Sequence, residues 1–317
     1  MKVLANDGIS KAGQDTLEQA GIEVITTKVA QEQLANYINS HQIEVVLVRS
    51  ATQVRKDVID ACPSIKIIGR GGVGMDNIDV DYARNKGIHV INTPAASSAS
   101  VAELVFAHLF GGVRFLYDAN RNMPLDGDSQ FNALKKSYAK GVELRGKTLG
   151  IVGIGKIGQE VAKIALGCGM NVIACDPFVK NVSIRVVLFN GQYFDVEINT
   201  IPLNEVLTQS DFVTLHIPKQ DKYIIGKTEL DKMKKGAGLI NASRGGLVDE
   251  EALLEALDRE QLSFAALDTF VNEPAPAIRV LMHPKVSLSP HIGASTLEAQ
   301  DRIGLKLAEQ IVTLTKK

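Results

Sequence analysis

The sequence predicts an α/β protein with two doubly wound domains, each built on a parallel β-sheet that carries helices on both faces. The chain has 317 residues, which is more than one ordinary core accommodates. Short, continuous apolar runs alternate with segments of helical periodicity along almost the whole chain, as expected for strands buried on both faces. These runs form two series, one on each side of a long helical segment.

The first series predicts five strands in the N-terminal part of the chain. Each run is too short for a helix and is bounded by polar or turn residues. We expect these strands at Lys2–Ala5, Glu23–Ile25, Glu44–Val48, Lys66–Ile68 and His89–Ile91. Apolar residues three and four positions apart predict helices over 11–19 and 31–39, between the strands.

The second series predicts six further strands. We expect them at Thr148–Val152, Val172–Ala174, Phe212–His216, Gly238–Ile240, Ala265–Leu267 and Val286–Leu288. Helical periodicity recurs between them over 161–165, 227–234 and 250–259. A different pattern interrupts this series at Ile184–Ile198, where two alternating runs flank Asn190 and Gly191. This pair favours a two-residue hairpin turn, so we expect an inserted β-hairpin with a structural or oligomer-contact role.

The two domains are expected to join in the segment from about Ser97 to Asn120. This segment reads as one long helix whose weak point is the pair Gly111 and Gly112. The polar stretch 122–140 behind it is typical of a surface. The last segment is again amphipathic and can return to the first domain. We therefore expect one domain at 1–98, completed by 294–317, and a second at 99–293, with a hinged cleft.

Composition excludes several classes of function. Lysine and arginine total 35 against 36 acidic residues, so no basic surface for nucleic acid is expected. No apolar stretch approaches the ~20 residues that span a bilayer, and the start shows no signal-peptide core, which favours the cytoplasm. The three cysteines (Cys62, Cys168 and Cys175) lack metal-ligand spacing and are expected to pack in the interior. No metal site is predicted.

A dinucleotide-binding loop is predicted after the strand 148–152. The motif Gly153-Ile154-Gly155-Lys156-Ile157-Gly158 lies between this strand and a helical run, which is the context that the mechanism requires. Gly153 permits the turn, Gly155 allows backbone amides to approach a pyrophosphate, and Gly158 allows close packing of helix on strand. Asp176 follows the next strand, where a carboxylate binds ribose hydroxyls and repels a 2′-phosphate. The pattern predicts a Rossmann-like domain that prefers NAD to NADP.

Three further residues follow strands of the same predicted sheet. Arg244 lies among small residues and can hold a carboxylate through two parallel hydrogen bonds. His291 and Glu273 form a pair suited to taking the proton of a hydroxyl group as hydride leaves. Singly, each has a plainer interpretation, as a surface ion pair, a loop histidine or a turn residue. Together, at the carboxyl ends of strands that also carry a dinucleotide loop, they predict oxidation of a 2-hydroxy acid.

Seven stretches of the sequence resemble the D-2-hydroxyacid dehydrogenase family, and within it the phosphoglycerate dehydrogenases most closely. They are Val48-Arg49-Ser50, GRGGVGMDNID (69–79), Asn92-Thr93-Pro94, GKTLGIVGIGKIG (146–158), NASRGGLVD (241–249), Ala266-Leu267-Asp268 and PHIGAS (290–295). The resemblance covers residues from about 43 to 300. It implies that the N-terminal domain binds substrate, that the second binds NAD, and that the enzyme oxidises D-3-phosphoglycerate to 3-phosphohydroxypyruvate, the first step of serine biosynthesis.

The resemblance also implies individual roles. Arg244 would bind the substrate carboxylate and keto oxygen, His291 would be the acid–base group and Glu273 its partner. Asp268 would help to hold the nicotinamide carboxamide, and His216 and Gly293 would complete the cofactor site. The backbone of Gly71, Gly72, Val73 and Gly74 would cradle the substrate carboxylate.

The phosphate end of the substrate calls for cations, and the resemblance implies Arg49 and Arg70. A third basic residue would come from the neighbouring subunit of a homodimer that forms through the NAD-binding domain. Lys136 is the nearest counterpart, although the family's usual tryptophan is absent beside it and a solvated helix face is the plainer interpretation of Lys135 and Lys136.

Two rival functions remain open at this point. Glyoxylate or hydroxypyruvate reduction would use the same chemistry on a substrate without phosphate. A protein of this fold can also act as an NAD-sensing corepressor that binds peptides, but no peptide-binding feature is evident and all the expected catalytic residues are present. The chain ends soon after its last helix, so we expect a short form without the C-terminal regulatory domain of longer relatives.

Overall fold

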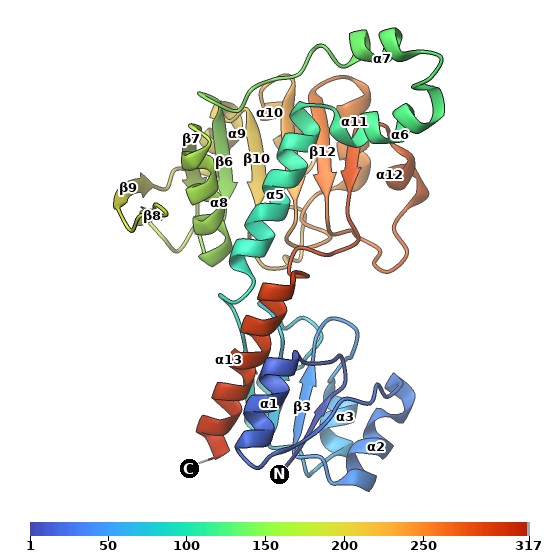
Figure 1. Cartoon of the computed structure of the whole chain (residues 1–317), viewed down its shortest axis with the longest axis vertical. Coiled ribbons are helices and arrows are strands. Elements are labelled where there is room, and N and C mark those ends of the chain that lie inside the picture. Colours follow the sequence, from blue (N-terminus) through green and yellow to red (C-terminus); the bar gives the residue numbers. More distant parts are fainter. Residues whose placement is uncertain (316–317) are drawn as a thin grey trace. The chain divides into compact units, whose positions relative to one another are not determined.

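The computed structural model describes residues 1–315, and the chain divides into two compact units. Unit 1 comprises Met1–Ser100 together with the chain from Ala294 onward, and unit 2 comprises Val101–Gly293. The chain thus crosses between the units twice, at residues 100–101 and 293–294. Each unit contains one parallel β-sheet with helices on both faces, which confirms the predicted fold class (Figure 1).

Unit 1 is built on a sheet of five parallel strands in the order β2-β1-β3-β4-β5. The strands are β1 (Lys2–Ala5), β2 (Glu23–Ile25), β3 (Val45–Val48), β4 (Ile67–Arg70) and β5 (His89–Asn92). The helices are α1 (Lys11–Gln19), the 3-10 turn η1 (Gln31–Gln33), α2 (Leu34–His41), α3 (Lys56–Ala61), α4 (Val80–Asn85) and α13 (Leu297–Thr315). Helices α2, α3 and α4 pack on one face, and α1 and α13 pack on the other.

The two ends of the described chain meet within unit 1, where α1 and α13 pack backbone to backbone. A Cβ atom at Gly13 would lie 2.6 Å from the carbonyl carbon of Gly304, and one at Gly304 would lie 2.3 Å from Ser10 Oγ. Real Cβ atoms do not approach other atoms this closely, so the contact requires both glycines. The N-terminal sheet is therefore covered on this face partly by the last helix of the chain.

Unit 2 is built on a sheet of six parallel strands in the order β13-β12-β11-β10-β6-β7. The strands are β6 (Thr148–Val152), β7 (Asn171–Cys175), β10 (Phe212–Leu215), β11 (Ala237–Asn241), β12 (Leu262–Leu267) and β13 (Val286–Leu288). The helices are α5 (Ser98–Val113), α6 (Leu116–Asp126), α7 (Phe131–Ser137), α8 (Lys156–Gly167), α9 (Leu203–Gln209), α10 (Lys227–Lys232), α11 (Glu250–Asp258) and α12 (Ile278–Met282). Helices α5 and α8 pack on one face of the sheet, and α9 to α12 pack on the other.

The prediction of one long helix at the domain junction was wrong, because two helices, α5 and α6, occupy this segment. The glycine pair lies inside α5, and the break comes at Arg114 and Phe115, where Phe115 adopts a left-handed conformation with φ 55°. Gly112 is needed for packing instead, since a Cβ atom there would lie 2.3 Å from the ring of Phe264. The described chain has no single helix long and apolar enough to cross a membrane. Only α5 and α6 together reach that length, across a 58° bend, and the apolar side chains of α5 are mostly buried in unit 2.

The predicted hairpin is present, but its turn is longer than two residues. Strands β8 (Asn181–Val187) and β9 (Tyr193–Asn199) form a separate antiparallel pair. Leu188 N–H donates to Gln192 C=O at 2.7 Å, and Gly191 N–H donates to Leu188 C=O at 2.9 Å, so residues 189–191 form the loop. Gly191 alone takes the left-handed conformation there, whereas a two-residue type I′ turn requires it at both central residues. Ile184 and Ile198 anchor the hairpin in the core of unit 2.

Candidate active site

The glycine loop follows β6 and leads into α8, as the sequence predicts. Gly153 adopts φ 95°, and a Cβ atom there would lie 2.5 Å from the carbonyl oxygen of His216. A Cβ atom at Gly158 would lie 2.2 Å from the carbonyl oxygen of Gly153. Gly155 is the N-cap of α8 and has no atom within 4 Å of the position its Cβ atom would occupy. Two of the glycines are therefore needed for packing, and the third leaves open space at the start of a helix.

Asp176 connects the glycine loop to the turn after β7. One carboxylate oxygen accepts a hydrogen bond from Ile154 N–H at 3.0 Å, and the other accepts from Phe178 N–H and Val179 N–H at 2.9 and 3.2 Å. The carboxylate thus fixes the shape of two loops. The oxygen that accepts from Ile154 keeps one lone pair for a ribose hydroxyl group, because each carboxylate oxygen can accept two hydrogen bonds.

His216 follows β10 on the other side of the glycine loop. It was predicted as the last residue of the strand, but the strand ends one residue earlier, at Leu215. Its Nε2 atom is 3.0 Å from Thr214 Oγ1, and its Nδ1 atom is shielded from solvent with no hydrogen-bond partner within residues 1–315. Burial lowers the pKa of His216 to about 3, because the charged imidazolium would be poorly solvated. The ring is therefore neutral at physiological pH and leaves a buried polar atom next to the loop.

These features fit a bound dinucleotide. The sheet of unit 2 reverses its strand order between β6 and β10, and ligands of open α/β sheets bind at this point, beyond the carboxyl ends of the strands. The open space at Gly155 lies at the N-terminus of α8, where backbone N–H groups and the helix dipole favour a pyrophosphate. Gly155, Lys156, Ile157 and Gly158 would hold that group, and Asp176 would bind the ribose.

Glu273 and His291 lie side by side, although 18 positions separate them in the sequence. The Nδ1 atom of His291 is 2.8 Å from Glu273 Oε2, and Glu273 Oε1 accepts a hydrogen bond from Phe270 N–H at 2.9 Å. The two side chains are 40% and 36% exposed, so the imidazole is reachable from solvent. Since Nδ1 is engaged by the carboxylate, Nε2 is the nitrogen left to exchange a proton with a ligand.

The loop that carries His291 is held by Asp268, which is 1% exposed. One oxygen of Asp268 accepts from Ile292 N–H at 2.9 Å and from the hydroxyl group of Ser289 at 2.6 Å. The other oxygen accepts from Gly293 N–H at 2.9 Å. His291 itself adopts φ 54°, a conformation that non-glycine residues seldom take. Asp268 thus brackets a strained residue that carries the acid–base candidate.

Arg244 lies in a tight loop after β11. Asn241 fastens this loop by donating to Arg244 C=O at 2.9 Å and accepting from Ser243 N–H at 3.1 Å. The guanidinium group of Arg244 donates to Ser243 C=O at 2.7 Å. A Cβ atom at Gly245 would lie 1.8 Å from Phe270 C=O, so the loop packs directly against the turn that holds Glu273. Arg244 and the Glu273–His291 pair therefore come from loops in contact.

The sequence analysis missed a buried histidine next to the loop that carries His291. His108 on α5 places Nδ1 2.8 Å from Ser287 Oγ and Nε2 2.8 Å from Ser289 Oγ. All three residues are less than 10% exposed. The sequence offered one indication, because Ser287 and Ser289 flank Leu288 in an otherwise apolar segment. Their partner could not be identified, since it lies about 180 residues earlier in the chain.

The two arginines predicted to bind phosphate lie at the same edge of the sheet of unit 1. Strands β3 and β4 are paired neighbours, Arg70 ends β4, and Arg49 directly follows β3. The side chain of Arg49 passes over Gly71, since a Cβ atom there would lie 3.5 Å from Arg49 Cγ. Arg70 donates weakly to Gly71 C=O at 3.4 Å, and a Cβ atom at Gly72 would meet its guanidinium group. The glycines make room for both arginine side chains.

The loop after β4 differs in part from the predicted cradle. Gly71 N–H donates to Val48 C=O at 2.8 Å and Gly72 N–H donates to Arg70 C=O at 3.0 Å, so both amides are already engaged. The amides of Val73 and Gly74 make no hydrogen bond within residues 1–315 and are the ones available to a ligand. Lys136 lies in unit 2, exposed on α7.

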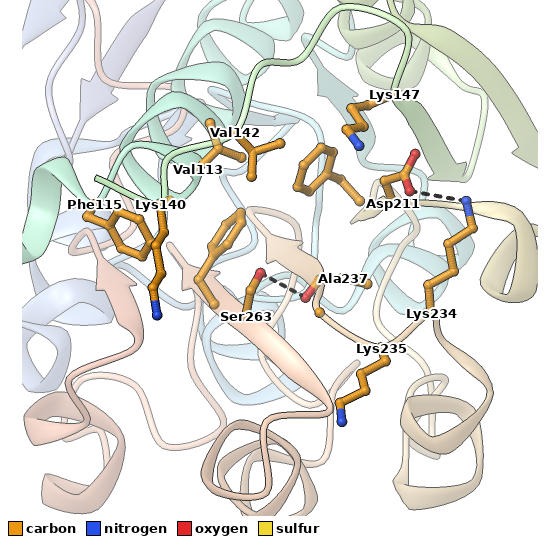
Figure 2. A pocket seen from close by; sticks show the side chains of 14 residues that line it. Val113, Phe115, Lys140, Val142, Lys147, Asp211, Lys234, Lys235, Ala237 and Ser263 are labelled. Carbon is orange, nitrogen blue, oxygen red and sulfur yellow. Dashed lines mark hydrogen bonds and ion pairs between the residues drawn. The ribbon is translucent and has the colours of Figure 1, made fainter. Parts of the chain in front are cut away.

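Unit 2 contains at least two cavities. One, of about 450 Å³, has a mainly apolar lining and includes Glu273 and His291 with Phe270, Pro274, Leu281 and Leu288. The other, of about 260 Å³, lies at the opposite ends of the strands and includes none of the predicted site residues (Figure 2). Within residues 1–315, no three His, Cys, Asp or Glu side chains are grouped to hold a metal ion.

Comparison with known proteins agrees with this geometry. Residues 106–293 match the family model described as D-isomer specific 2-hydroxyacid dehydrogenase, NAD binding domain. A D-3-phosphoglycerate dehydrogenase of Methanocaldococcus jannaschii is 40% identical over 98% of this chain, and the chain spans 57% of that relative's length. A hydroxypyruvate reductase of Thermotoga maritima is also 40% identical, over 98% of this chain and 97% of its own.

A solved structure adds support from the fold. The NAD⁺-bound 3-phosphoglycerate dehydrogenase of Entamoeba histolytica has a TM-score of 0.78 and 27% identity, and the match covers 100% of this chain and 96% of that one. The family match takes in β6, the glycine loop, Arg244, Glu273 and His291, which are the elements described above. The chain belongs to the D-isomer specific 2-hydroxyacid dehydrogenase family, and unit 2 is its NAD-binding domain.

Proposed function

We propose that the protein oxidises a D-2-hydroxy acid by hydride transfer to NAD, with D-3-phosphoglycerate as the substrate and 3-phosphohydroxypyruvate as the product. The observation that carries this proposal is the Glu273–His291 pair, 2.8 Å apart in the same unit as the glycine loop. A histidine with a carboxylate on Nδ1 and a free Nε2 is suited to remove the proton of a hydroxyl group.

The chemistry follows from these positions. Bound NAD⁺ supplies the hydride acceptor. Nε2 of His291 takes the hydroxyl proton, and Glu273 stabilises the imidazolium that results. The guanidinium group of Arg244 binds the substrate carboxylate and the developing keto oxygen, which fixes the α-carbon toward the cofactor. Asp268 and Gly293 hold the His291 loop and contribute to the nicotinamide site, and His216 borders the glycine loop.

The choice of a phosphorylated substrate rests on unit 1. Arg49 and Arg70 end neighbouring strands, and two guanidinium groups at one edge suit a dianionic phosphate better than a methyl or hydroxymethyl group. The free amides of Val73 and Gly74 are candidates to bind the substrate carboxylate. Lys136 would contact the phosphate from a second subunit. Unit 1 is then the substrate-binding domain of the enzyme.

A homodimer and a cytoplasmic location complete the proposal. Several large apolar side chains of unit 2 are 41–75% exposed along one stretch of chain, namely Phe110, Leu116, Met123, Leu125, Phe131 and Val142. Exposed apolar side chains gathered in this way favour a contact with another copy. Sedimentation equilibrium would test this assembly.

Hydroxypyruvate reduction is the second candidate function. It is favoured by the similarity to the T. maritima reductase, which is 40% identical over 98% of this chain. The same acid–base pair would serve, with His291 donating the proton.

A steady-state comparison of substrates tests the proposal. The purified protein is assayed with NAD⁺ and 3-phosphoglycerate, glycerate or lactate, and with NADH and hydroxypyruvate. We expect the highest kcat/KM with 3-phosphoglycerate. Hydroxypyruvate turnover without any phosphoglycerate oxidation would establish the second candidate, and inactivity with all four would reject the enzyme and favour a binding role.

A further inference from the structure

A buried chain of hydrogen bonds joins α5 to the loop that carries His291. His108 contacts Ser287 and Ser289 at 2.8 Å each, and Ser289 donates to Asp268 at 2.6 Å. Asp268 in turn accepts from the backbone N–H groups of Ile292 and Gly293 at 2.9 Å each. The chain therefore ends on the two residues that directly follow His291.

The donors and acceptors of this chain fix its direction. The carboxylate of Asp268 accepts, so the single hydroxyl hydrogen of Ser289 points toward it. Ser289 Oγ must then accept from His108, which places the ring proton on Nε2. The remaining nitrogen, Nδ1, accepts from the hydroxyl group of Ser287. One neutral tautomer satisfies every member, and burial lowers the pKa of His108 in spite of the nearby Asp268, which keeps the ring neutral.

We propose that His108 is a positioning residue for the reaction, acting through Ser289 and Asp268 on the His291 loop. His291 adopts a positive φ, and such a conformation persists only where its surroundings hold it in place. Asp268 supplies that constraint, and His108 holds Ser289 in the orientation that engages Asp268. The expected effect on kcat rests on the proposed function, whereas the expected effect on the order of the His291 loop does not depend on it.

Two substitutions at one position test the chain. His108→Leu removes both polar atoms, whereas His108→Gln keeps a donor for Ser289 and an acceptor for Ser287. We expect His108→Leu to lower kcat about tenfold, the equivalent of about one net hydrogen bond. The Kd for NAD, measured by calorimetry, should change less than kcat, because the glycine loop is intact. His108→Gln should restore most of kcat. Leu109→Ala, a neighbouring core substitution on α5, should lower Tm with kcat largely retained.

Hydrogen–deuterium exchange provides a readout that does not depend on activity. In the apoenzyme, we expect residues 289–293 to exchange faster in His108→Leu than in His108→Gln or Leu109→Ala. Wild-type exchange of this segment in His108→Leu would overturn the positioning role. If the wild-type protein oxidises no 2-hydroxy acid, the proposed function fails, and the exchange comparison still decides whether His108 holds the loop.

The 260 Å³ cavity carries a second inference from different residues. It lies where β10, β11 and β12 begin, at the ends of the strands opposite the glycine loop and His291. It is lined by phenylalanine rings, by Asp211 and by four lysines, which come from the starts of these strands and from the chain before β6 (Figure 2). Nothing in the proposed reaction uses it, and of the side chains proposed for the dimer contact it shares Val142 alone.

The cavity has a lining of mixed polarity, which includes two aromatic rings and an excess of positive charge. The rings of Phe212 and Phe264 lie 6.2 Å apart between centroids, and both are nearly fully buried. Four lysines line the cavity against one carboxylate, and Asp211 is engaged by Lys234 at 3.1 Å. The ammonium groups of Lys140, Lys147 and Lys235 make no hydrogen bond or ion pair with residues 1–315.

We infer that this cavity binds a small anion that carries a flat apolar group, such as an aryl phosphate or an aryl carboxylate. Apolar side chains combined with a few polar groups are typical of small-molecule sites, and the flat group would contact the accessible edges of Phe264 and Phe212. The free ammonium groups would form charge-assisted hydrogen bonds with the anion.

Calorimetry with three probes tests this site. The full chain is titrated with phenyl phosphate, inorganic phosphate and phenol. We expect phenyl phosphate to bind at least about tenfold more tightly than either partial probe, and the double variant Lys140→Glu/Lys235→Glu to abolish that difference. Lys28→Glu/Lys56→Glu, with the same charge change on unit 1, is the matched control. Equal binding of phenyl phosphate and phosphate, or unchanged binding in the cavity variant, would overturn the inference.

Discussion

The two sheets of the protein share one strand order but carry different groups at the same topological point. In each unit the first strand lies between the second and the third, which gives β2-β1-β3 in unit 1 and β7-β6-β10 in unit 2. In each sheet, successive strands are therefore added first on one side of the first strand and then on the other. The change of side falls between β1 and β3 in unit 1 and between β6 and β10 in unit 2. In an open α/β sheet, both points are places where a ligand can bind.

In unit 1 this point is filled by the protein's own side chains. Asn6, directly after β1, bonds to the backbone of Val29 and to Thr52 at 2.8–3.1 Å. Asp7 accepts from Arg49 N–H at 2.7 Å and from both the backbone and the hydroxyl group of Thr52. In unit 2 the corresponding loop has Gly155 with nothing within 4 Å of its Cβ position. The same topology thus forms a closed loop in one unit and an open cradle in the other.

The difference teaches that the fold supplies the position and the loop sequence decides its use. In unit 1 the polar residues that remain at the carboxyl edge are cations and free amides, which suit an anionic substrate. In unit 2 they are a glycine turn, the carboxylate of Asp176, which we propose binds ribose, and the Glu273–His291 pair, which we propose transfers the proton. Substitutions at the carboxyl edge of one sheet at a time therefore separate the two roles.

The largest effect is expected at the acid–base pair of unit 2. His291→Ala should lower kcat by roughly 10²–10⁴, because a positioned proton acceptor is lost. The Kd for NAD, measured by calorimetry, should change little, since the glycine loop is intact. Glu273→Gln should give a smaller loss, because the imidazole keeps a hydrogen-bond partner without its charge. Full activity of His291→Ala would assign the base to another group.

A smaller, substrate-dependent effect is expected at the edge of unit 1. Arg49→Ala or Arg70→Ala should lower kcat/KM for 3-phosphoglycerate about tenfold to a hundredfold, as expected for the loss of a charge-assisted hydrogen bond of ~1.5–3 kcal/mol. Hydroxypyruvate reduction should be affected much less, because that substrate has no phosphate. Arg244→Ala is the control, since it should depress both reactions. Equal losses with both substrates in the unit 1 variants would remove the argument for a phosphate.

The open cradle itself can be tested by adding one methyl group. Gly155→Ala should weaken NAD binding about tenfold, because the methyl group enters the space that a pyrophosphate would use, while Tm stays close to that of the wild type. Gly158→Ala should lower both the affinity for NAD and Tm, since its Cβ atom would clash with Gly153 C=O. Calorimetry and thermal unfolding of the two variants distinguish a glycine that leaves room for the ligand from one that is required for packing. A stable Gly155→Ala variant with wild-type NAD affinity would contradict the assignment.

The fold was predictable because apolar runs report buried parallel strands directly. The eleven expected strands are all present, four of them with the predicted bounds and the others with ends shifted by at most three residues. The glycine loop was identifiable because its motif lies between a strand and a helix. The contact of Glu273 with His291 follows from the same logic, since both residues follow strands of one parallel sheet. Their catalytic roles, and those of Arg49, Arg70 and Lys136, stay predictions.

The remaining features depend on contacts that no local pattern encodes. The helix break falls at Phe115 and not at the glycine pair, because Gly112 is required for the approach of Phe264. His108 meets Ser287 and Ser289 only through the packing of α5 on the sheet, so an isolated histidine in an apolar helix gave no indication of its partners. Likewise, Asn6 and Asp7 gave no sign that they close the loop of unit 1.

The smallest effect concerns the pH dependence of stability and arises from His216, which borders the open cradle of unit 2. Its pKa of about 3 in the folded protein lies below the ordinary value of 6.5, so below about pH 6.5 the unfolded chain binds a proton that the folded chain does not. The stability that this residue contributes is therefore fully present above pH 6.5 and is lost as the pH falls toward 3. Between pH 8 and pH 6 the loss amounts to about 1 kcal/mol. His216→Asn cannot take up this proton, so its free energy of unfolding, measured by urea denaturation, should fall by about 1 kcal/mol less than that of the wild type over the same interval. Parallel pH profiles of the two proteins would show that the ring of His216 takes up a proton in the folded apoenzyme as readily as in the unfolded chain.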